Sequence, residues 1–250
     1  EEEYDSRIQF YSGQARDLRK SFIITNKNNF MKDQTKFLEF LGILIGDGCL
    51  LFYPKHRNYG IEIAGNRTQI ELYNNLGDFL EKFTDKRPRL DLSRKNSAEA
   101  IRLVLYSKNF VNYLIHDVGI PHKNKTKTVT IPMQYIDWEY SKHIIKGIFE
   151  ADGCLHFSRH KKGSIPSYPR LQIKSNSENL ISQISQILNQ QGFRSTVLKH
   201  KNGKNFIFSV YLSGEKNLNL WSDKIGFFIG RNKSKYLRWK KFKYSSSNLS

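Results

Sequence analysis

The chain has 250 residues, and its 41 Lys and Arg against 23 Asp and Glu give a net charge of +18. Hydrophobic residues make up 38% of the chain, which is enough to build a core and excludes wholesale disorder. The excess charge is uneven, since residues 151–250 carry a net +14 and residues 1–150 a net +4. Such a surplus predicts a polyanionic partner, most often nucleic acid, although a surface charged only for solubility is the alternative.

Two cysteines, Cys49 and Cys154, are present, and without a CxxC pair they do not indicate a structural zinc site. We expect both to be free, reduced and packed among apolar neighbours. The longest apolar run, 40–45, is too short to span a bilayer, and the first residues do not resemble a secretory signal. These features favour an intracellular protein of the cytoplasm, the nucleoid or an organelle matrix.

The first part of the chain predicts an α-β-β-α-β-β-α unit. Residues 1–32 show little apolar periodicity and are expected to form an N-terminal arm. Asp33 is a predicted N-cap for a helix that runs through Gly46. After it the patterns predict strands 49–53 and 60–66, helix 67–84, strands 87–94 and 100–108, and a short helix 109–118.

The second part of the chain repeats this order. The patterns predict strands 154–160 and 168–174, helix 178–191, strands 194–201 and 205–213, and helix 215–224. The dipeptide Asn202-Gly203 indicates a hairpin turn. We therefore expect an α+β fold of two pseudo-symmetric repeats with antiparallel sheets. The predicted boundaries are a first repeat 33–122, a linker 123–137, and a second repeat 138–250 that ends in a basic tail.

Two matching stretches, 40–48 and 145–153, stand out in this pattern. Each is an apolar helical segment with small residues four positions apart, and each ends in Asp-Gly followed by Cys-Leu. Residues four apart lie on one face of a helix, so each helix presents a bare backbone stripe on which the other can pack closely. The small residues of this predicted helix interface are Gly42, Gly46, Gly147 and Ala151.

Packing of the two stripes predicts that Asp47 and Asp152 emerge side by side. One Asp-Gly by itself most often marks a turn at the end of a helix. Two copies after matching helices are not expected from turn chemistry alone. Adjacent carboxylates repel each other unless a cation lies between them. The pair therefore predicts a divalent metal site, and Mg²⁺ suits hard oxygen ligands.

The strands alternate apolar and polar residues, so each sheet is expected to bury one face and expose the other. Arg and Gln on an exposed face can make bidentate contacts with purine edges in the major groove, although a simple solvated face is the alternative. In the second repeat the candidate DNA-binding residues are His156, Ser158, Arg170, Gln172, Lys174, Lys199, Lys201 and Tyr211. In the first repeat they are Lys55, Arg57, Arg89 and Arg102.

The two stretches resemble the two LAGLIDADG motifs of single-chain homing endonucleases, which are encoded by mobile introns or found within inteins. The similarity runs from about residue 33 to residue 243 and includes the element order of each half. In that family the motif helices form the domain interface, and a saddle of antiparallel sheets straddles duplex DNA. The resemblance implies a monomeric, Mg²⁺-dependent endonuclease that cleaves both DNA strands, with Mn²⁺ or Ca²⁺ able to occupy the same site.

The resemblance also implies roles for individual residues. The last acid of each motif would bind the metal and the scissile phosphates, one strand per acid, with a neighbouring carbonyl as a further ligand. A lysine after the last helix of each repeat assists the family's chemistry, and phosphate anchoring is the alternative role. The residues concerned are the acids Asp47 and Asp152, the carbonyls of Gly46 and Ala151, and the lysines Lys125 and Lys233.

Two positions depart from the family's pattern. The sixth motif position, often Asp in the family, is Ile45 in the first copy and Glu150 in the second. The polar residue that positions water in the family falls near 65–66 and 175–176. Gly65 has no side chain with which to do so.

The sequence leaves two other classes of function. A binding protein on the same scaffold, either an RNA maturase for host intron RNA or a non-cleaving DNA-binding protein, would need the basic face but not the acids. A zinc protein built on His156 and His160 would need both rings on one helix face, whereas these residues fall in a strand and a turn.

Overall fold

The computed structural model describes residues 27–92, 99–159, 167–203 and 205–247, with side chains from residue 34 to residue 242 within these ranges. By its contacts the chain divides into residues 1–37 and residues 38–250, and both sheets belong to the second unit. Most of the expected N-terminal arm, and His160 of the zinc alternative, lie outside the described residues. In the part of the chain that is described, no helix is both long and apolar enough to cross a bilayer.

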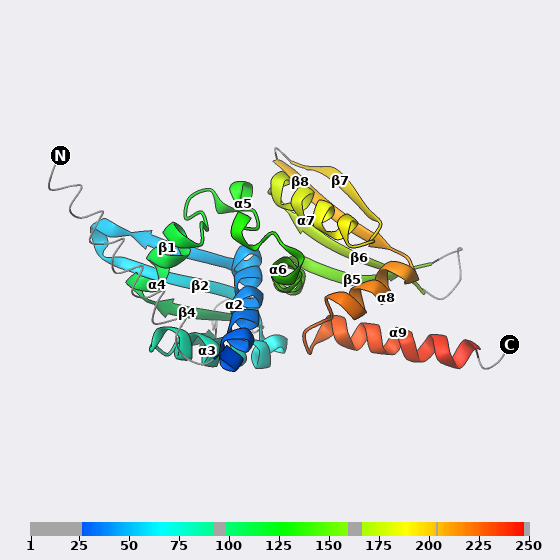
Figure 1. Ribbon diagram of the computed structural model, residues 1–250, viewed down its shortest axis with the longest axis horizontal. Coiled ribbons are helices and arrows are strands. Elements are labelled where there is room, and N and C mark those ends of the chain that lie inside the picture. Colours follow the sequence, from blue (N-terminus) through cyan, green and yellow to red (C-terminus); the bar gives the residue numbers. More distant parts are fainter. Residues whose placement is uncertain (1–26, 93–98, 160–166, 204, 248–250) are drawn as a thin grey trace. The chain divides into compact units, whose positions relative to one another are not determined.

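The first sheet contains four antiparallel strands in the order β1-β2-β4-β3 (Figure 1). Helix α2 leads directly into this sheet. Helix α4 follows the last strand, and one π-helical turn, Tyr113–Asp117, continues it. Its elements are α2 (Lys27–Asp47), β1 (Gly48–Tyr53), β2 (Asn58–Asn66), α3 (Ile70–Thr84), β3 (Arg89–Leu92), β4 (Ala100–Tyr106) and α4 (Lys108–Asn112).

The second sheet has the corresponding strand order, β5-β6-β8-β7. A connection with the one-turn helix α5 (Lys125–Thr128) precedes it. The elements are α6 (Trp138–Asp152), β5 (Gly153–Ser158), β6 (Tyr168–Ser175), α7 (Glu178–Gln190), β7 (Ser195–Asn202), β8 (Asn205–Ser213), α8 (Glu215–Lys224) and α9 (Arg231–Ser247). Gly48 pairs with Ile63 as Gly153 pairs with Ile173, so the two sheets share one register. The predicted α+β fold with two antiparallel sheets is confirmed.

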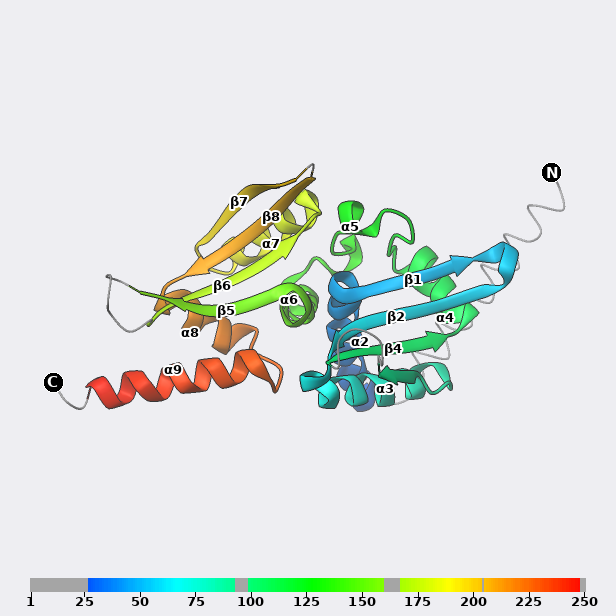
Figure 2. The same ribbon diagram turned by 180° about the vertical axis from the view of Figure 1, so that it is seen from behind.

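Each sheet buries the apolar face that its alternating sequence predicts. In the view of Figure 2 the strands of each sheet lie in front of the helices that cover them. Residues two apart on a strand share a face, so one row of each strand meets the helices and the other does not. The buried row is Ile61, Ile63, Leu103 and Leu105 in the first sheet and Leu155, Leu171, Ile173, Val210 and Leu212 in the second.

Helices α2 and α6 touch backbone to backbone. A Cβ atom added to Gly42 would lie 2.1 Å from the carbonyl oxygen of Ile144, and one added to Gly147 would lie 2.2 Å from that of Glu39. A hydrogen atom is thus the largest substituent that either position accepts. An ion pair of 2.6 Å between Lys146 and Glu39 spans the same helix pair. The interface between the halves is therefore made by the motif helices, as the fold prediction states.

Two features of the helices differ from the sequence-based expectation. Asp33 was expected to cap a helix, but α2 begins at Lys27 and Asp33 lies inside it. The six residues before Asp33 include only two apolar ones, Phe30 and Met31, and two adjacent residues do not make an apolar period, so no start signal was visible. Helix α9 was not predicted, because its 17 residues are mostly basic and polar. Only Tyr236 and Trp239 supply large buried side chains in its described part.

The helix contact yields a stability prediction. Gly147→Ala places a methyl group against the backbone of α2, and overpacking of this kind costs about 1–3 kcal/mol or more in the free energy of unfolding. Gly77→Ala in α3 is the matched control, because the nearest atom to the added Cβ is 3.9 Å away. That variant should gain about 0.5–1 kcal/mol from helix propensity. Urea unfolding measures both, and equal stability of the two variants would contradict the packing described here.

Candidate functional site

Asp47 and Asp152 are the last residues of α2 and α6, and the close helix contact brings them together. A Cβ on Gly46 would lie 2.5 Å from the Cβ of Ala151 and 3.1 Å from Oδ2 of Asp152. The charge of Asp47 acts on Asp152 strongly enough to raise its pKa. The two halves therefore contribute one acid each to a single site.

Both carboxylates are reached by solvent, yet enough protein surrounds them that desolvation is the main influence on their protonation. Desolvation raises the pKa of Asp47, and Lys125 opposes this. Desolvation, followed by the charge of Asp47, raises the pKa of Asp152 to about 6. A pair of acids that resists ionisation in this way gains stability from a cation bound between them.

Lys125 provides one fixed positive charge beside these acids. Its Nζ donates to the carbonyl oxygens of Leu44 at 2.8 Å, Ile45 at 2.6 Å and Gly46 at 3.2 Å. These carbonyls form the C-terminal end of α2, where a helix carries partial negative charge. Desolvation lowers the pKa of Lys125 to about 8, although Asp152, Cys49 and Asp47 oppose this shift.

Lys233, the predicted counterpart of Lys125, has different surroundings. Its ammonium lies 5.6 Å from the ring centroid of Tyr236, and among the described residues it makes no contact with either acid. In the same helix Lys235 donates to the carbonyl oxygen of Leu155 at 2.9 Å, and Asn232 accepts from the N–H of that residue. The sequence echo between the two tails therefore does not place equivalent lysines at the acids.

The protein offers a small set of hard oxygen ligands at this site. Among the described residues no group of three or more His, Cys, Asp or Glu is arranged to hold a metal. A cation held by the two carboxylates, with the carbonyls of Gly46 and Ala151 as expected further ligands, would need other oxygen ligands to complete its shell, and Mg²⁺ accepts such a shell. Desolvation, and then the charges of Arg170, Lys235 and Lys174, lower the pKa of His156. Zinc is disfavoured at His156, because three positive charges lie this close to it.

Tyr73 fills the space that a side chain at position 65 would need. Its hydroxyl donates to the carbonyl oxygen of Ala64 at 2.6 Å, and a Cβ on Gly65 would lie 1.9 Å from that hydroxyl oxygen. Desolvation, and then the charges of Asp47 and Glu150, raise the pKa of Tyr73. No pattern in the sequence predicts this neighbour of the site, and the one signal for it is Gly65 itself.

Glu150, the sixth residue of the second motif, is a buried link between the halves. It is 8% exposed, and its Oε1 accepts a hydrogen bond of 2.8 Å from Nε2 of Gln69. Desolvation raises its pKa, against the hydrogen bond from Gln69 and the charges of Arg231 and Lys146. Ile45 at the matching position is buried without such partners in the described residues. The departures from the family's pattern at this position are thus accommodated by packing.

The second sheet presents most of its predicted polar row on the face away from the helices. The strand register puts His156, Arg170, Gln172, Lys174, Ser209 and Tyr211 on this face, with Ser158 at the end of β5.

Cys49 and Cys154 are free thiols on the corresponding faces of the two sheets, and Cys49 is exposed rather than packed. Its place on the outer row of β1, opposite Glu62, is the reason.

Lys199 and Lys201 do not share that face. They pair with Phe208 and Phe206, which place them on the opposite side of β7. The Lys199 ammonium lies 4.5 Å from the ring centroid of Phe206. Because side chains alternate along a strand, the outer row of β7 is formed by Thr196, Leu198 and His200. The two lysines, which the sequence predicts as DNA-binding residues, therefore lie off the polar face of the second sheet.

The candidate residues of the first sheet are of two kinds. Lys55 and Arg57 are exposed at the turn between β1 and β2, where Arg57 has a left-handed backbone with φ of 50°. Arg89 and Arg102 lie on the outer face of the sheet and form ion pairs with carboxylates. The arginines of the first sheet are thus partly neutralised by carboxylates. The cations on the outer face of the second sheet are instead grouped together.

The coupled acids predict a pH-dependent stability. Because the folded pKa of Asp152 is raised from 3.8 to about 6, the folded state binds a proton that the unfolded state releases. The native protein should lose stability relative to Asp152→Asn as the pH rises through this window, in the presence of EDTA. Thermal unfolding at about pH 4 and about pH 7.5 measures the difference. Asp223→Asn, at an exposed site on α8, is the control, and a pH-independent difference would contradict the coupling.

Residues 139–226 match the family model described as a LAGLIDADG-like domain. Among curated proteins, the chain is 24% identical over 143 residues to the tRNA-splicing ligase RtcB of Methanopyrus kandleri. This match covers 53% of the chain and 14% of RtcB, so the chain spans only a small part of that relative's length.

Solved structures with the same fold include a homing endonuclease, a LAGLIDADG meganuclease and a DUF199/WhiA protein. The homing endonuclease I-DmoI in complex with DNA and Ca superposes with a TM-score of 0.58 at 16% identity, over 84% of this chain and 98% of that one. The LAGLIDADG meganuclease I-AabMI bound to uncleaved DNA gives 0.55 at 12% identity, over 84% and 91%. Full-length DUF199/WhiA from Thermatoga maritima gives 0.53 at 14% identity, over 91% and 66%.

At these identities the structural likeness establishes the fold, and the family model adds the domain in the second half. Both agree with the two motifs that end at Asp47 and Asp152. The chain thus contains a LAGLIDADG-like domain in residues 139–226 and has the fold of the single-chain LAGLIDADG homing endonucleases, which confirms the resemblance indicated by its sequence.

Proposed function

We propose that the protein is a site-specific endonuclease that hydrolyses both strands of a long duplex DNA site with divalent metal ions. The observation that carries this proposal is the meeting of Asp47 and Asp152 at the ends of α2 and α6, where desolvation raises both pKa values and the charge of Asp47 raises that of Asp152 further. No structural task in the helix interface requires two acids at that place. A cation and a phosphate group explain them together.

The metal-binding groups in this proposal are the carboxylates of Asp47 and Asp152 and the carbonyl oxygens of Gly46 and Ala151. When bound, the metal ion supplies neutralisation of phosphoryl charge and a more acidic water molecule. We assign Mg²⁺, because an oxygen set with few protein ligands suits it. Mn²⁺ and Ca²⁺ fit the same donors, and crystal structures of I-DmoI with DNA contain Mn or Ca.

Lys125 is proposed to act as a fixed cation and not as a proton carrier. An ammonium group has three donors, and in Lys125 all three are matched by the carbonyls of α2. Loss of a proton would leave one carbonyl unpaired in a partly desolvated place. Its charge stabilises the ionised acids and the phosphate beside them. Lys233 and Lys235 are proposed to contact the DNA backbone.

The DNA is proposed to lie against the outer faces of the two sheets, with the chain acting as a monomer. A net charge of +18 supplies the attraction to the phosphates. The outer row of the second sheet offers Arg170 and Lys174, whose charges can meet phosphates. The outer row of the first sheet offers Arg89 and Arg102, which can read purine edges. The two acids, one from each half, then cleave one strand each.

Substitution of the acids tests the reaction. A target duplex is first selected from a random library by binding to the native protein in EDTA. Asp47→Asn and Asp152→Asn should bind this duplex as the native protein does and cleave it at least about 100-fold more slowly. Asp223→Asn on α8 should cleave at the native rate. Undiminished cleavage by the double variant would refute the mechanism, whereas binding without any cleavage by the native protein would leave a DNA-binding protein.

The raised pKa of Asp152 predicts how cleavage depends on pH. Metal binding needs ionised carboxylates, so the single-turnover rate should fall as the pH is lowered through about 6. A higher Mg²⁺ concentration competes with the proton and should move the midpoint to lower pH. A midpoint that is insensitive to the Mg²⁺ concentration would show that another group controls the rate.

A further inference from the structure

The two repeats differ in charge although they share one fold. Residues 33–122 carry 12 Lys and Arg and 11 Asp and Glu, a net +1. Residues 138–250 carry 20 Lys and Arg and 6 Asp and Glu, a net +14. Attraction to the DNA backbone grows with the number of cations that meet phosphates. The second repeat therefore supplies most of the attraction that does not depend on base sequence.

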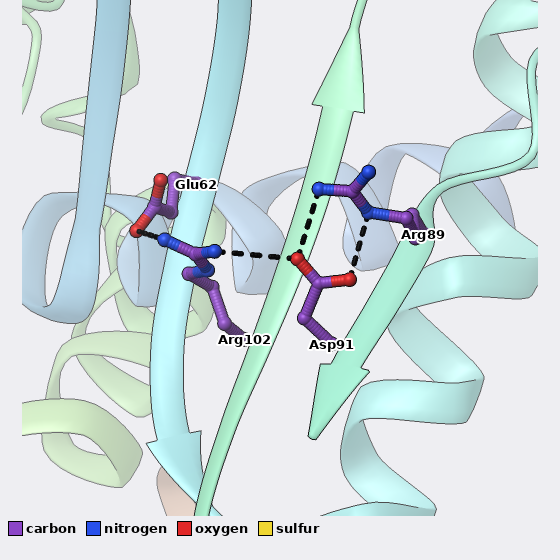
Figure 3. Close-up of polar contacts among 4 residues, drawn as sticks. All are labelled: Glu62, Arg89, Asp91 and Arg102. Carbon is purple, nitrogen blue, oxygen red and sulfur yellow. Dashed lines mark hydrogen bonds and ion pairs between the residues drawn. The ribbon is translucent and has the colours of Figure 1, made fainter. Parts of the chain in front are cut away.

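On the first sheet, four charged side chains form one network across β2, β4 and β3 (Figure 3). Arg102 donates to Oε1 of Glu62 at 3.1 Å and to Oδ2 of Asp91 at 3.3 Å. Asp91 also accepts from Nε of Arg89 at 2.7 Å. The strand register places all four on the face away from the buried row. This is the face that the proposed function turns toward DNA.

The second sheet has no such network at the same positions. Because the registers match, the equivalents of Glu62, Arg102, Asp91 and Arg89 are Gln172, Ser209, Leu198 and Thr196. All four are uncharged, and Gln172 donates to the hydroxyl of Tyr211. The network therefore belongs to the first repeat alone and does not follow from the shared fold.

On the outer face of the second sheet, cations from the strands and from α9 are instead grouped without acids. Arg170, Lys174 and Lys235 all act on His156, and each lowers its pKa. Within the residues that the structure describes, none of these three forms an ion pair. Such cations can approach the phosphates of any sequence.

A paired arginine behaves differently toward DNA. A carboxylate on each side fixes the direction of the guanidinium and leaves its other N–H groups for a base edge, as in bidentate contacts with guanine. The same carboxylates repel phosphates, so they cancel much of the attraction that a bare arginine would have to any duplex. Asp and Glu can also accept from the amino group of cytosine. Pairing thus lowers general affinity and favours contacts with particular base pairs.

We propose that the network of Glu62, Arg102, Asp91 and Arg89 makes the first sheet the sequence-reading half of the DNA interface, while the second sheet anchors the DNA backbone. This inference rests on the proposed function in that duplex DNA is the ligand, but it does not require cleavage. Glu62 and Asp91 act against binding to random DNA, and they hold the two arginines in place for base contacts in one half of the target.

Isosteric removal of the acids tests the network. Glu62→Gln and Asp91→Asn should bind a random duplex about 5–10-fold more tightly, with a salt dependence steeper by up to about one phosphate contact. They should also lose about 5–100-fold of the discrimination against wrong base pairs in the half-site under the first sheet. Fluorescence anisotropy in EDTA measures the dissociation constants without cleavage.

Two matched controls separate this effect from a general change of charge. Asp78→Asn removes an equal charge from an exposed ion pair with Arg87 on α3, away from the sheet face, and should change neither quantity. Gln172→Glu places a carboxylate at the position equivalent to Glu62 and should weaken binding to all sequences alike. The half-site under the first sheet is assigned independently, by attaching a DNA-cleaving iron chelate to Cys49 in a Cys154→Ser background.

The outcomes are distinct from those of the nuclease test. Unchanged affinity for random duplex and unchanged discrimination in both acid variants would overturn the inference, even if the native protein cleaves DNA. Loss of discrimination in the half-site under the second sheet would overturn it as well. The expected shifts would support it even if no cleavage is found. Absence of any duplex binding by the native protein would refute both this inference and the proposed function.

Discussion

The contact on which the rest of the structure depends is the backbone approach of α2 and α6 at Gly42 and Gly147. An added Cβ would lie 2.1 Å from one backbone oxygen and 2.2 Å from another, so the distance between the helices is set by the absence of side chains. Both helices end at an aspartate. Close packing therefore fixes the separation of Asp47 and Asp152, and with it any chemistry that needs two carboxylates at one place.

This packing also creates the electrostatic character of the site. Two acids that are partly desolvated by the same helix contact resist ionisation, and Lys125 compensates only part of that cost. Among the described residues Lys125 has no counterpart from the second repeat at the acids, since Lys233 lies against Tyr236. The site is thus symmetric in its acids and asymmetric in its cation. A bound divalent metal ion would offset the rest of the cost of ionising the two carboxylates. Binding of metal and phosphate therefore accounts for the acids better than a role in stabilising the fold.

The same contrast between a symmetric backbone and asymmetric side chains extends over the sheets. Equal strand order and register place equivalent positions on equivalent faces, but Asp91 has Leu198 as its counterpart and Arg102 has Ser209. Under the proposed function, a single chain can diverge in this way because each half would meet a different part of an asymmetric DNA site. The pairing of arginines in one half and the grouping of cations in the other would then serve different purposes within one binding surface.

The sequence by itself determined the order of the sheet strands and of the helices α2 to α4 and α6 to α8. It also determined the antiparallel sheets and the meeting of the motif helices, since each depends on local periodicity and on small residues at helical spacing. It did not reveal that Tyr73 fills the place at Gly65, or that Lys199 faces away from the polar row. Only the tertiary structure decided these two points and the ion pairs of Arg102. They depend on side chains brought together from different strands and helices, and the spacing of residues along one segment carries no record of such neighbours.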